Sequence, residues 1–122
     1  MTLVDTSVWI EHWRRGNARL AAALDLGAVA AHPFVVGELA CGSIPKRAST
    51  LRLLEALPLV AAARHDEVMA LVDRESLAAT GLGWVDAHLL TASRLHGTRL
   101  WTLDRALRRA AERIGVFGEP EI

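Results

Sequence analysis

Four acidic residues stand in short motifs whose side chains could do chemistry together. They are Asp5 in D-T-S, Glu38 in V-G-E-L, Asp86 in W-V-D-A-H and Asp104 in T-L-D. Several carboxylates in one pocket raise one another's pKa unless a divalent cation offsets their charge. Hard oxygen donors, in a chain with no Cys/His set at zinc spacing, favour Mg²⁺ or Mn²⁺. Such a cluster is a standard arrangement for phosphodiester hydrolysis, because the metal lowers the pKa of a bound water.

Each acid also has a simpler structural interpretation. An Asp at a strand–helix junction commonly caps the helix or interacts with its dipole, and this applies to Asp86 and Asp104. Glu38 is harder to explain in this way, since its neighbours Val36 and Leu39 are apolar and a solvated surface is not its expected place. A buried, unpaired carboxylate would cost several kcal/mol or stay protonated. The four acids together are therefore more informative than any one of them.

Short apolar segments alternate with segments of helical periodicity along the whole chain. The predicted strands are 2–4, 28–31, 59–61, 99–102 and 115–117. The predicted helices are 7–15, 18–26, 34–41 with Pro33 at the first position, 46–57, 66–79, 85–95 and 104–113. This alternation predicts an α/β fold in three layers, α/β/α, with a short and mostly parallel central sheet covered by helices on both faces.

The predicted elements place the acids at one edge of that sheet. In an open parallel sheet the functional crevice lies beyond the carboxyl ends of the strands. Asp5 directly follows the first strand, and Asp104 follows the strand at 99–102. Asp86 in the first turn of its helix, and Glu38 on the helix after the second strand, can point into the same crevice. We therefore expect all four acids to meet there.

The composition restricts the class of protein. The chain has 122 residues and no repeat or linker, so we expect a single domain over residues 1–122. Hydrophobic residues make up 52%, which excludes a disordered chain, and 14 basic residues balance 14 acidic ones. Any binding of nucleic acid must therefore come from a local patch. Cys41 is the single cysteine and there is neither a signal peptide nor a membrane-length apolar run, so we expect a cytoplasmic protein.

The motifs D-T-S-V-W-I, G-E-L, G-L-G-W-V-D-A-H-L-L and L-W-T-L-D resemble those of PIN-domain nucleases, above all the VapC toxins of bacterial type II toxin–antitoxin pairs. The resemblance covers essentially the whole chain, with all four acidic motifs in the same order and spacing. It implies a single PIN domain whose catalytic acids are Asp5, Glu38, Asp86 and Asp104. Asp5 and Asp86 would be the direct ligands of Mg²⁺ or Mn²⁺. Thr6 and Thr102 match positions where the family often carries a hydroxyl beside the site.

The resemblance also implies an activity and partners. The reaction would be metal-dependent, in-line attack of water on an RNA phosphodiester, leaving 5′-phosphate and 3′-hydroxyl ends. The substrates would be structured RNAs such as tRNA or ribosomal RNA, cut in exposed loops. A small VapB-type antitoxin would block the site with its C-terminal segment. The toxin would be a homodimer, sometimes within a larger toxin–antitoxin assembly. Two alternatives stay open: a PIN nuclease that processes RNA without an antitoxin, and a non-catalytic PIN module that binds RNA or protein.

Basic and aromatic residues near these motifs suggest binding surfaces. One helical face directly after Asp104 carries Arg105, Arg108, Arg109 and Arg113. This stripe could guide an RNA backbone toward the acids, but a solvated face paired with Glu112 explains it equally well.

Trp9 and Trp13, four residues apart, are typical of a core, although near the site they could line a groove for a partner. The five histidines show no catalytic arrangement.

Overall fold

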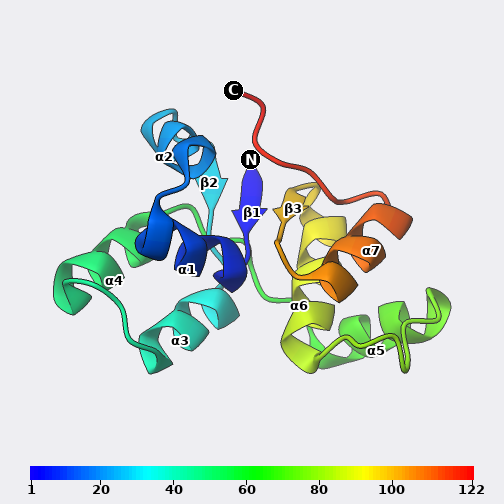
Figure 1. Cartoon of the computed structure of the whole chain (residues 1–122). Coiled ribbons are helices and arrows are strands. Elements are labelled where there is room, and N and C mark those ends of the chain that lie inside the picture. Colours follow the sequence, from blue (N-terminus) through cyan, green and yellow to red (C-terminus); the bar gives the residue numbers. More distant parts are fainter.

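The computed structural model describes all of residues 1–122 and is built on a short parallel sheet (Figure 1). The strands are β1 (Thr2–Val4), β2 (Val29–Ala30) and β3 (Arg99–Trp101), in the order β2-β1-β3. Both neighbours of β1 run parallel to it, with Leu3 opposite Ala30 on one side and opposite Leu100 on the other. The predicted α/β class with a parallel central sheet is confirmed.

Seven helices surround the sheet: α1 (Thr6–Arg15), α2 (Ala18–Asp25), α3 (Pro33–Cys41), α4 (Arg47–Ala56), α5 (His65–Arg74), α6 (Trp84–His96) and α7 (Arg105–Arg113). Six of them agree with the predicted ranges to within one residue at each end. Local chemistry explains their ends. The Asn17 side chain accepts a hydrogen bond from Leu20 N at the start of α2, and Gly97 adopts a left-handed conformation after α6. No helix has the length and apolar character needed to cross a membrane.

The prediction of one long helix over 66–79 is wrong, because α5 ends at Arg74. Ser76 has a positive φ of 54°, and Leu77 N donates back to the carbonyl of Val72. The Leu77 side chain is buried. The chain therefore leaves the helix at a point where turning back places Leu77 in the core, and burial outweighs the helical preference of the residues that follow.

The strands predicted at 59–61 and 115–117 are also wrong, because each is reduced to a single bridge. Ala31 pairs with Leu59 at one edge of the sheet, and Leu100 pairs with Phe117 at the other. Each segment buries only one side chain, Val60 in the first and Val116 in the second. One buried residue gives too little packing to hold an extended strand against the sheet.

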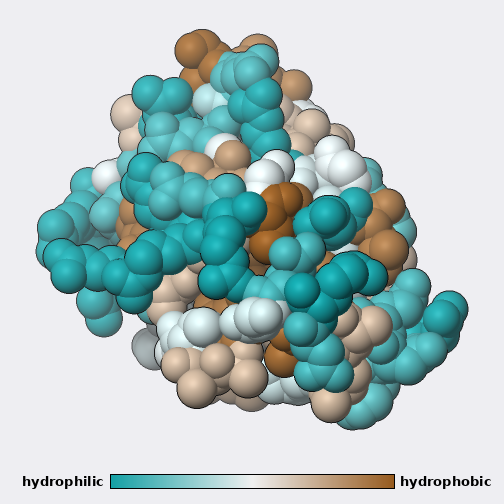
Figure 2. Space-filling model, turned by 90° about the vertical axis from the view of Figure 1, so that its right-hand side faces the viewer, coloured by the Kyte–Doolittle hydropathy of each residue, from teal (hydrophilic) through white to brown (hydrophobic).

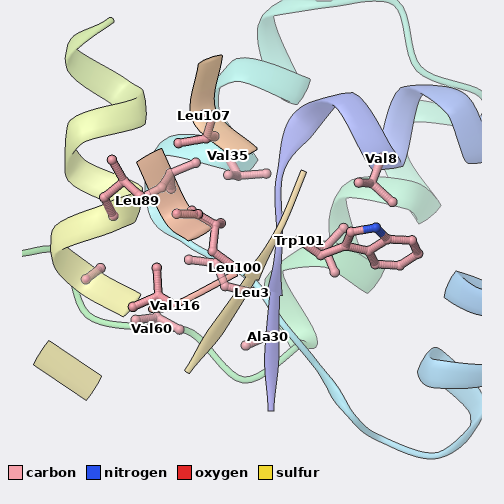
Figure 3. Close-up of a cluster of buried hydrophobic side chains, with 14 of the residues drawn as sticks. Leu3, Val8, Ala30, Val35, Val60, Leu89, Leu100, Trp101, Leu107 and Val116 are labelled. Atoms are coloured by element: carbon pink, nitrogen blue, oxygen red, sulfur yellow. The ribbon is translucent and has the colours of Figure 1, made fainter. Parts of the chain in front are cut away.

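The core lies on both faces of the sheet and fixes how the strands end (Figure 3). Leu3 and Leu100 point toward Leu89 of α6, whereas Trp101 points the other way, toward Val8 of α1. All five side chains are almost completely buried. Burial of a Leu or Val side chain contributes about 1.5–3 kcal/mol. This packing sets the relative positions of β1 and β3, and with them the residues that follow each strand.

Candidate acidic site

Asp5 follows β1 and is held beside the end of β3. Its backbone N–H donates to the carbonyl of Trp101 at 3.0 Å, which continues the pairing of the two strands. Its side-chain Oδ2 accepts hydrogen bonds from the hydroxyls of Ser7 at 2.8 Å and Thr102 at 2.7 Å. Asp5 is only 7% exposed, and although it precedes α1 its carboxylate makes no capping hydrogen bond to that helix. Helix capping therefore does not explain this buried acid.

The two hydroxyls that hold Asp5 are themselves fixed by the backbone of the β3–α7 loop. Ser7 Oγ accepts from Leu103 N, and Thr102 Oγ1 accepts from Asp104 N, both at 3.0 Å. Each hydroxyl thus donates to Asp5 and accepts from the loop. Thr102 contacts Asp5, as expected, whereas Ser7 was not among the residues expected beside the site. The D-T-S motif carried the signal, because Ser two residues after Asp often forms a local side-chain hydrogen bond.

Glu38 lies on α3 and meets α1. The hydroxyl of Thr6, the first residue of α1, donates to Glu38 Oε1 at 2.9 Å and so links α1 to α3. Thr6 directly follows Asp5 in the chain. The expectation that Glu38 avoids solvent is wrong, because its side chain is exposed. Val35 and Leu39 turn toward the core on one side of α3, which leaves Glu38 at the rim, next to the first turn of α1.

Asp86 and Asp104 both make the hydrogen bonds expected at the start of a helix. Asp86 Oδ2 accepts from Gly83 N at 3.0 Å, and Asp104 Oδ2 accepts from Leu107 N at 2.9 Å. The interpretation of these two acids as residues that cap a helix is therefore correct for one oxygen of each carboxylate. In each of them the second carboxylate oxygen receives no hydrogen bond from the protein. Capping occupies one half of each group and leaves the other half available.

The four acids form one electrostatic cluster. Burial raises the pKa of Asp86, the Gly83 N–H opposes this shift, and the carboxylates of Asp5, Asp104 and Glu38 raise the pKa further. None of the four forms an ion pair, although five Arg–carboxylate pairs occur elsewhere in the molecule. The cluster thus carries negative charge that no side chain balances.

The cluster is looser than a closed metal site. No three Asp, Glu, His or Cys side chains converge tightly enough to hold an ion between them. The donor set fits a divalent cation by its chemistry, since it consists of carboxylates with free oxygens and no competing cation. The spacing of the side chains does not define the ligands, so the roles of Asp5 and Asp86 as ligands stay a prediction.

The arginine stripe on α7 divides into two kinds of residue. Arg108 pairs with Glu112 at 3.7 Å and lies over the ring of Phe117, and Arg113 donates to the carbonyl of Glu75. Arg105 and Arg109 are exposed and have no protein partner. Pairing with Glu112 at the surface, the simpler explanation of the stripe, therefore applies to Arg108. Arg105 and Arg109 stay free to contact a phosphate.

Aromatic rings connect three histidines, His32, His65 and His88, that no local sequence pattern groups together. His32 lies 5.2 Å from Phe34, which lies 4.5 Å from His88, between ring centroids. His88 contacts Trp84 at 4.7 Å, and Trp84 contacts His65 at 5.1 Å. Burial lowers the pKa of His88 and lowers that of His32 to about 4. These rings form a column from the buried His32 to the exposed Trp84 and His65.

A second aromatic pair lies on α1. The rings of Trp9 and Trp13 are 5.7 Å apart, and Trp9 is almost completely buried. Trp9 therefore belongs to the core, in agreement with the simpler interpretation of its spacing, while Trp13 packs against the edge of that core.

A short parallel sheet with helices on both faces and acids beyond its carboxyl edge is the arrangement of a PIN domain, and the PIN-domain family model matches residues 2–113. The chain is also 48% identical, over 123 aligned residues, to Ribonuclease VapC32 of Mycobacterium tuberculosis, and the match covers 100% of this chain and 99% of that protein. The chain therefore belongs to the PIN-domain family and, within it, to the VapC ribonucleases.

Solved structures agree with this fold. A toxin–antitoxin complex from Klebsiella pneumoniae matches with a TM-score of 0.67 and 20% identity, over 85% of this chain and 87% of that one. FitAcB from Neisseria gonorrhoeae matches with a TM-score of 0.62 and 22% identity, over 92% of this chain and 94% of that one. At such identities the likeness establishes the shared fold alone.

Proposed function

We propose that this protein is a Mg²⁺- or Mn²⁺-dependent endoribonuclease, the toxin of a type II toxin–antitoxin pair. Its reaction is hydrolysis of phosphodiester bonds in the loops of structured RNA such as tRNA or ribosomal RNA. The 48% identity to a protein named as a ribonuclease supports the substrate class. The observation that carries the proposal is the cluster of four acids, none of which forms an ion pair, in which burial and the charges of the other three raise the pKa of Asp86.

The acids have distinct roles in this proposal. Asp5 and Asp86 hold the divalent cation, because Asp5 is buried, Asp86 is half-buried, and each keeps one carboxylate oxygen free of protein hydrogen bonds. When bound, the cation lowers the pKa of water and offsets charge that develops on the phosphate. Glu38 and Asp104 are exposed and accept hydrogen bonds from water in the same space. Ser7 and Thr102 keep the Asp5 carboxylate oriented.

The arginines of α7 contact the RNA backbone in the proposal. Asp104 caps α7, so the helix begins at the acids and carries its basic residues away from them. Arg105 and Arg109 have no protein partner, and Arg108 can exchange its exposed pair with Glu112 for a phosphate. An exposed pair of this kind contributes at most about 1 kcal/mol. Figure 2 shows this side of the molecule, where hydrophilic residues predominate and smaller apolar areas lie between them.

The partner in the cell is, in this proposal, a small VapB-type antitoxin, and the toxin itself forms a homodimer. The structural match to a toxin–antitoxin complex from Klebsiella pneumoniae supports an antitoxin partner. An antitoxin segment that places a basic side chain among the four acids would supply the counter-charge that the toxin lacks. Binding of this kind would compete directly with binding of the cation.

The test is cleavage of RNA by the purified protein. With Mg²⁺ or Mn²⁺ present, the wild-type protein is expected to cut a structured RNA and to stop when EDTA removes the metal. Asp5→Asn should abolish cutting, since the amide keeps the hydrogen bonds from Ser7 and Thr102 but loses the charge. Asp25→Asn, at an exposed acid at the end of α2, is the matched control and should cut normally. Cutting by Asp5→Asn, or after EDTA treatment, would refute the proposal.

The two alternatives are separated by the same cleavage experiment together with expression of the protein in growing cells. A PIN nuclease that processes RNA without an antitoxin would cut RNA but would not arrest growth when expressed. A non-catalytic module would bind RNA or protein and cut nothing with either metal. The four acids, all present and unpaired, favour catalysis over binding alone.

A further inference from the structure

Trp84, at the first position of α6, is an exposed aromatic residue whose chain neighbour Gly83 is hydrogen-bonded to the Asp86 carboxylate. It is 43% exposed, whereas Trp9 and Trp101 are each 2% exposed. Trp84 precedes Asp86 by two residues. The residue before Trp84, Gly83, donates a backbone hydrogen bond to the Asp86 carboxylate. A large aromatic surface left exposed at such a place is typical of a binding site.

The Trp84 indole packs against two histidine rings. The ring of His88 meets it nearly at right angles, at 87° and 4.7 Å between centroids, and the ring of His65 lies 5.1 Å away. His88 is buried and packs against Phe34, so the support reaches into the core. An indole has two side-chain torsions and loses little conformational entropy on binding, which makes it an effective contact surface.

Trp84 also lines an apolar hollow of about 220 Å³ between α5, the following loop and α6. Other side chains that line it are Met69, Val72, Leu77, Leu82 and Ala87. No charged or hydroxyl side chain takes part in this lining. The hollow therefore suits a flat apolar group rather than a phosphate.

A second hollow lies on the other side of Leu77. It is lined by Arg109 and Arg113 of α7 together with Thr80, and Leu77 takes part in both hollows. An apolar surface and a basic surface thus adjoin across one buried side chain, both next to the helices that carry Asp86 and Asp104. A single-stranded RNA offers the same pair of features, an aromatic base and a charged phosphate, in each nucleotide.

We propose that one unstacked base of the RNA, next to the phosphodiester that is cut, binds in the apolar hollow against Trp84. This inference rests on the proposed ribonuclease function and adds the way in which the substrate is held. In this inference Trp84 binds substrate, and the base stacks on the indole equally in the bound substrate and in the transition state. Loss of the indole therefore raises KM and leaves kcat nearly unchanged.

The first experiment compares Trp84→Ala, Trp84→Phe and Leu53→Ala in the cleavage of a hairpin RNA with an unpaired loop. Leu53 is similarly exposed but lies on α4, so its variant is the matched control. We expect Trp84→Ala to raise KM by about 5- to 150-fold, the usual range for loss of one base–aromatic stack. The Trp84→Phe variant should retain most of the affinity, and the Leu53→Ala variant should match the wild-type protein.

The second experiment tests the base itself. Binding of a fluorescein-labelled loop RNA is measured by anisotropy in the Asp5→Asn protein without divalent cation. Abasic sites are placed one at a time at each unpaired nucleotide of the loop. One of them should weaken binding as much as Trp84→Ala does, and the two changes together should be no worse than either alone. Independent, additive losses, or no abasic site that matches, would overturn the inference.

The outcomes separate this inference from the function on which it rests. If the wild-type protein cuts RNA and Trp84→Ala leaves KM unchanged, the stacking inference fails and the proposed function stands. If the wild-type protein cuts nothing, the proposed function fails, while the anisotropy experiment still decides whether Trp84 binds a base. If Trp84→Ala turns a dimer into a monomer in sedimentation with RNA binding unchanged, the hollow is an interface between two copies and the inference is wrong.

Discussion

The buried His32 gives a quantitative prediction about stability and pH. Its Nδ1 accepts a hydrogen bond from Phe34 N at 3.0 Å at the start of α3, and its Nε2 is buried without a partner. Burial, together with repulsion from His88, lowers the pKa of His32 from 6.5 to about 4. Protonation of Nδ1 would also remove the acceptor that caps the helix. The folded protein therefore holds this histidine neutral across most of the acidic range.

The magnitude follows from proton linkage. Between pH 6.5 and about 4 the unfolded chain binds a proton at this histidine and the folded chain does not, so the free energy of unfolding falls as the pH falls. With about 1.4 kcal/mol for each pKa unit, this histidine alone lowers stability by about 2 kcal/mol between pH 7 and 5. The complete loss, below pH 4, is about 3 kcal/mol. Above pH 7 the contribution is constant.

The assay is urea unfolding, followed by circular dichroism, at pH 7, 6 and 5. His32→Asn is the informative variant, because Asn can accept the same capping hydrogen bond but does not titrate. It is expected to be less stable at pH 7, since a buried ring is lost, yet its stability should fall by about 2 kcal/mol less between pH 7 and 5. His96→Asn, at an exposed histidine, should keep the wild-type slope. Parallel pH profiles for the wild-type protein and His32→Asn would refute the reasoning.

Substitutions at two further residues, Asp104 and Ser7, separate structural from chemical roles at the acidic site. Asp104→Ala should lower the free energy of unfolding by about 0.5–2 kcal/mol through loss of the helix cap, whereas Asp104→Asn should keep the cap. Urea unfolding and RNA cleavage, measured on both variants, should find both inactive and only Asp104→Ala destabilised. An active Asp104→Asn variant would show that the charge is not needed. Ser7→Ala removes a hydrogen bond to Asp5 and should lower kcat by about 10- to 100-fold with about 1 kcal/mol of lost stability. A kcat that stays at the wild-type value would make Ser7 a purely structural residue.

The acids next to the strands were predictable because their positions depend on the local sequence. Asp5 directly follows an apolar strand, and parallel strands end at the same edge of a sheet, so Asp5 and the β3–α7 loop had to meet. The ends of most helices were predictable for the same reason. Pro33 starts α3 and Gly97 ends α6 through backbone preferences that need no tertiary contact.

The features that sequence reasoning missed depend on packing between distant segments. Glu38 has apolar neighbours in the chain, but the contact of α3 with α1 decides which side of α3 faces solvent. The segment after α5 contains no Gly or Pro before Gly81, and only the burial of Leu77 explains the turn at Ser76. The column of histidine and aromatic rings joins three helices, so no local pattern could reveal it.

The donors that the chain uses for its acids support a cation-binding role over a structural one. Asp5 and Glu38 receive hydroxyls, and Asp86 and Asp104 receive backbone N–H groups, always at one oxygen of the carboxylate. Neutral donors fix the orientation of a carboxylate without cancelling its charge. An arginine would stabilise a purely structural acid better, because it would also offset the repulsion that raises the pKa of Asp86. Arg105 and Arg109 lie on the helix that Asp104 caps, and neither pairs with an acid. The fold thus orients the four carboxylates through neutral donors and pairs none of them with a basic side chain, an arrangement whose charge a bound cation would balance.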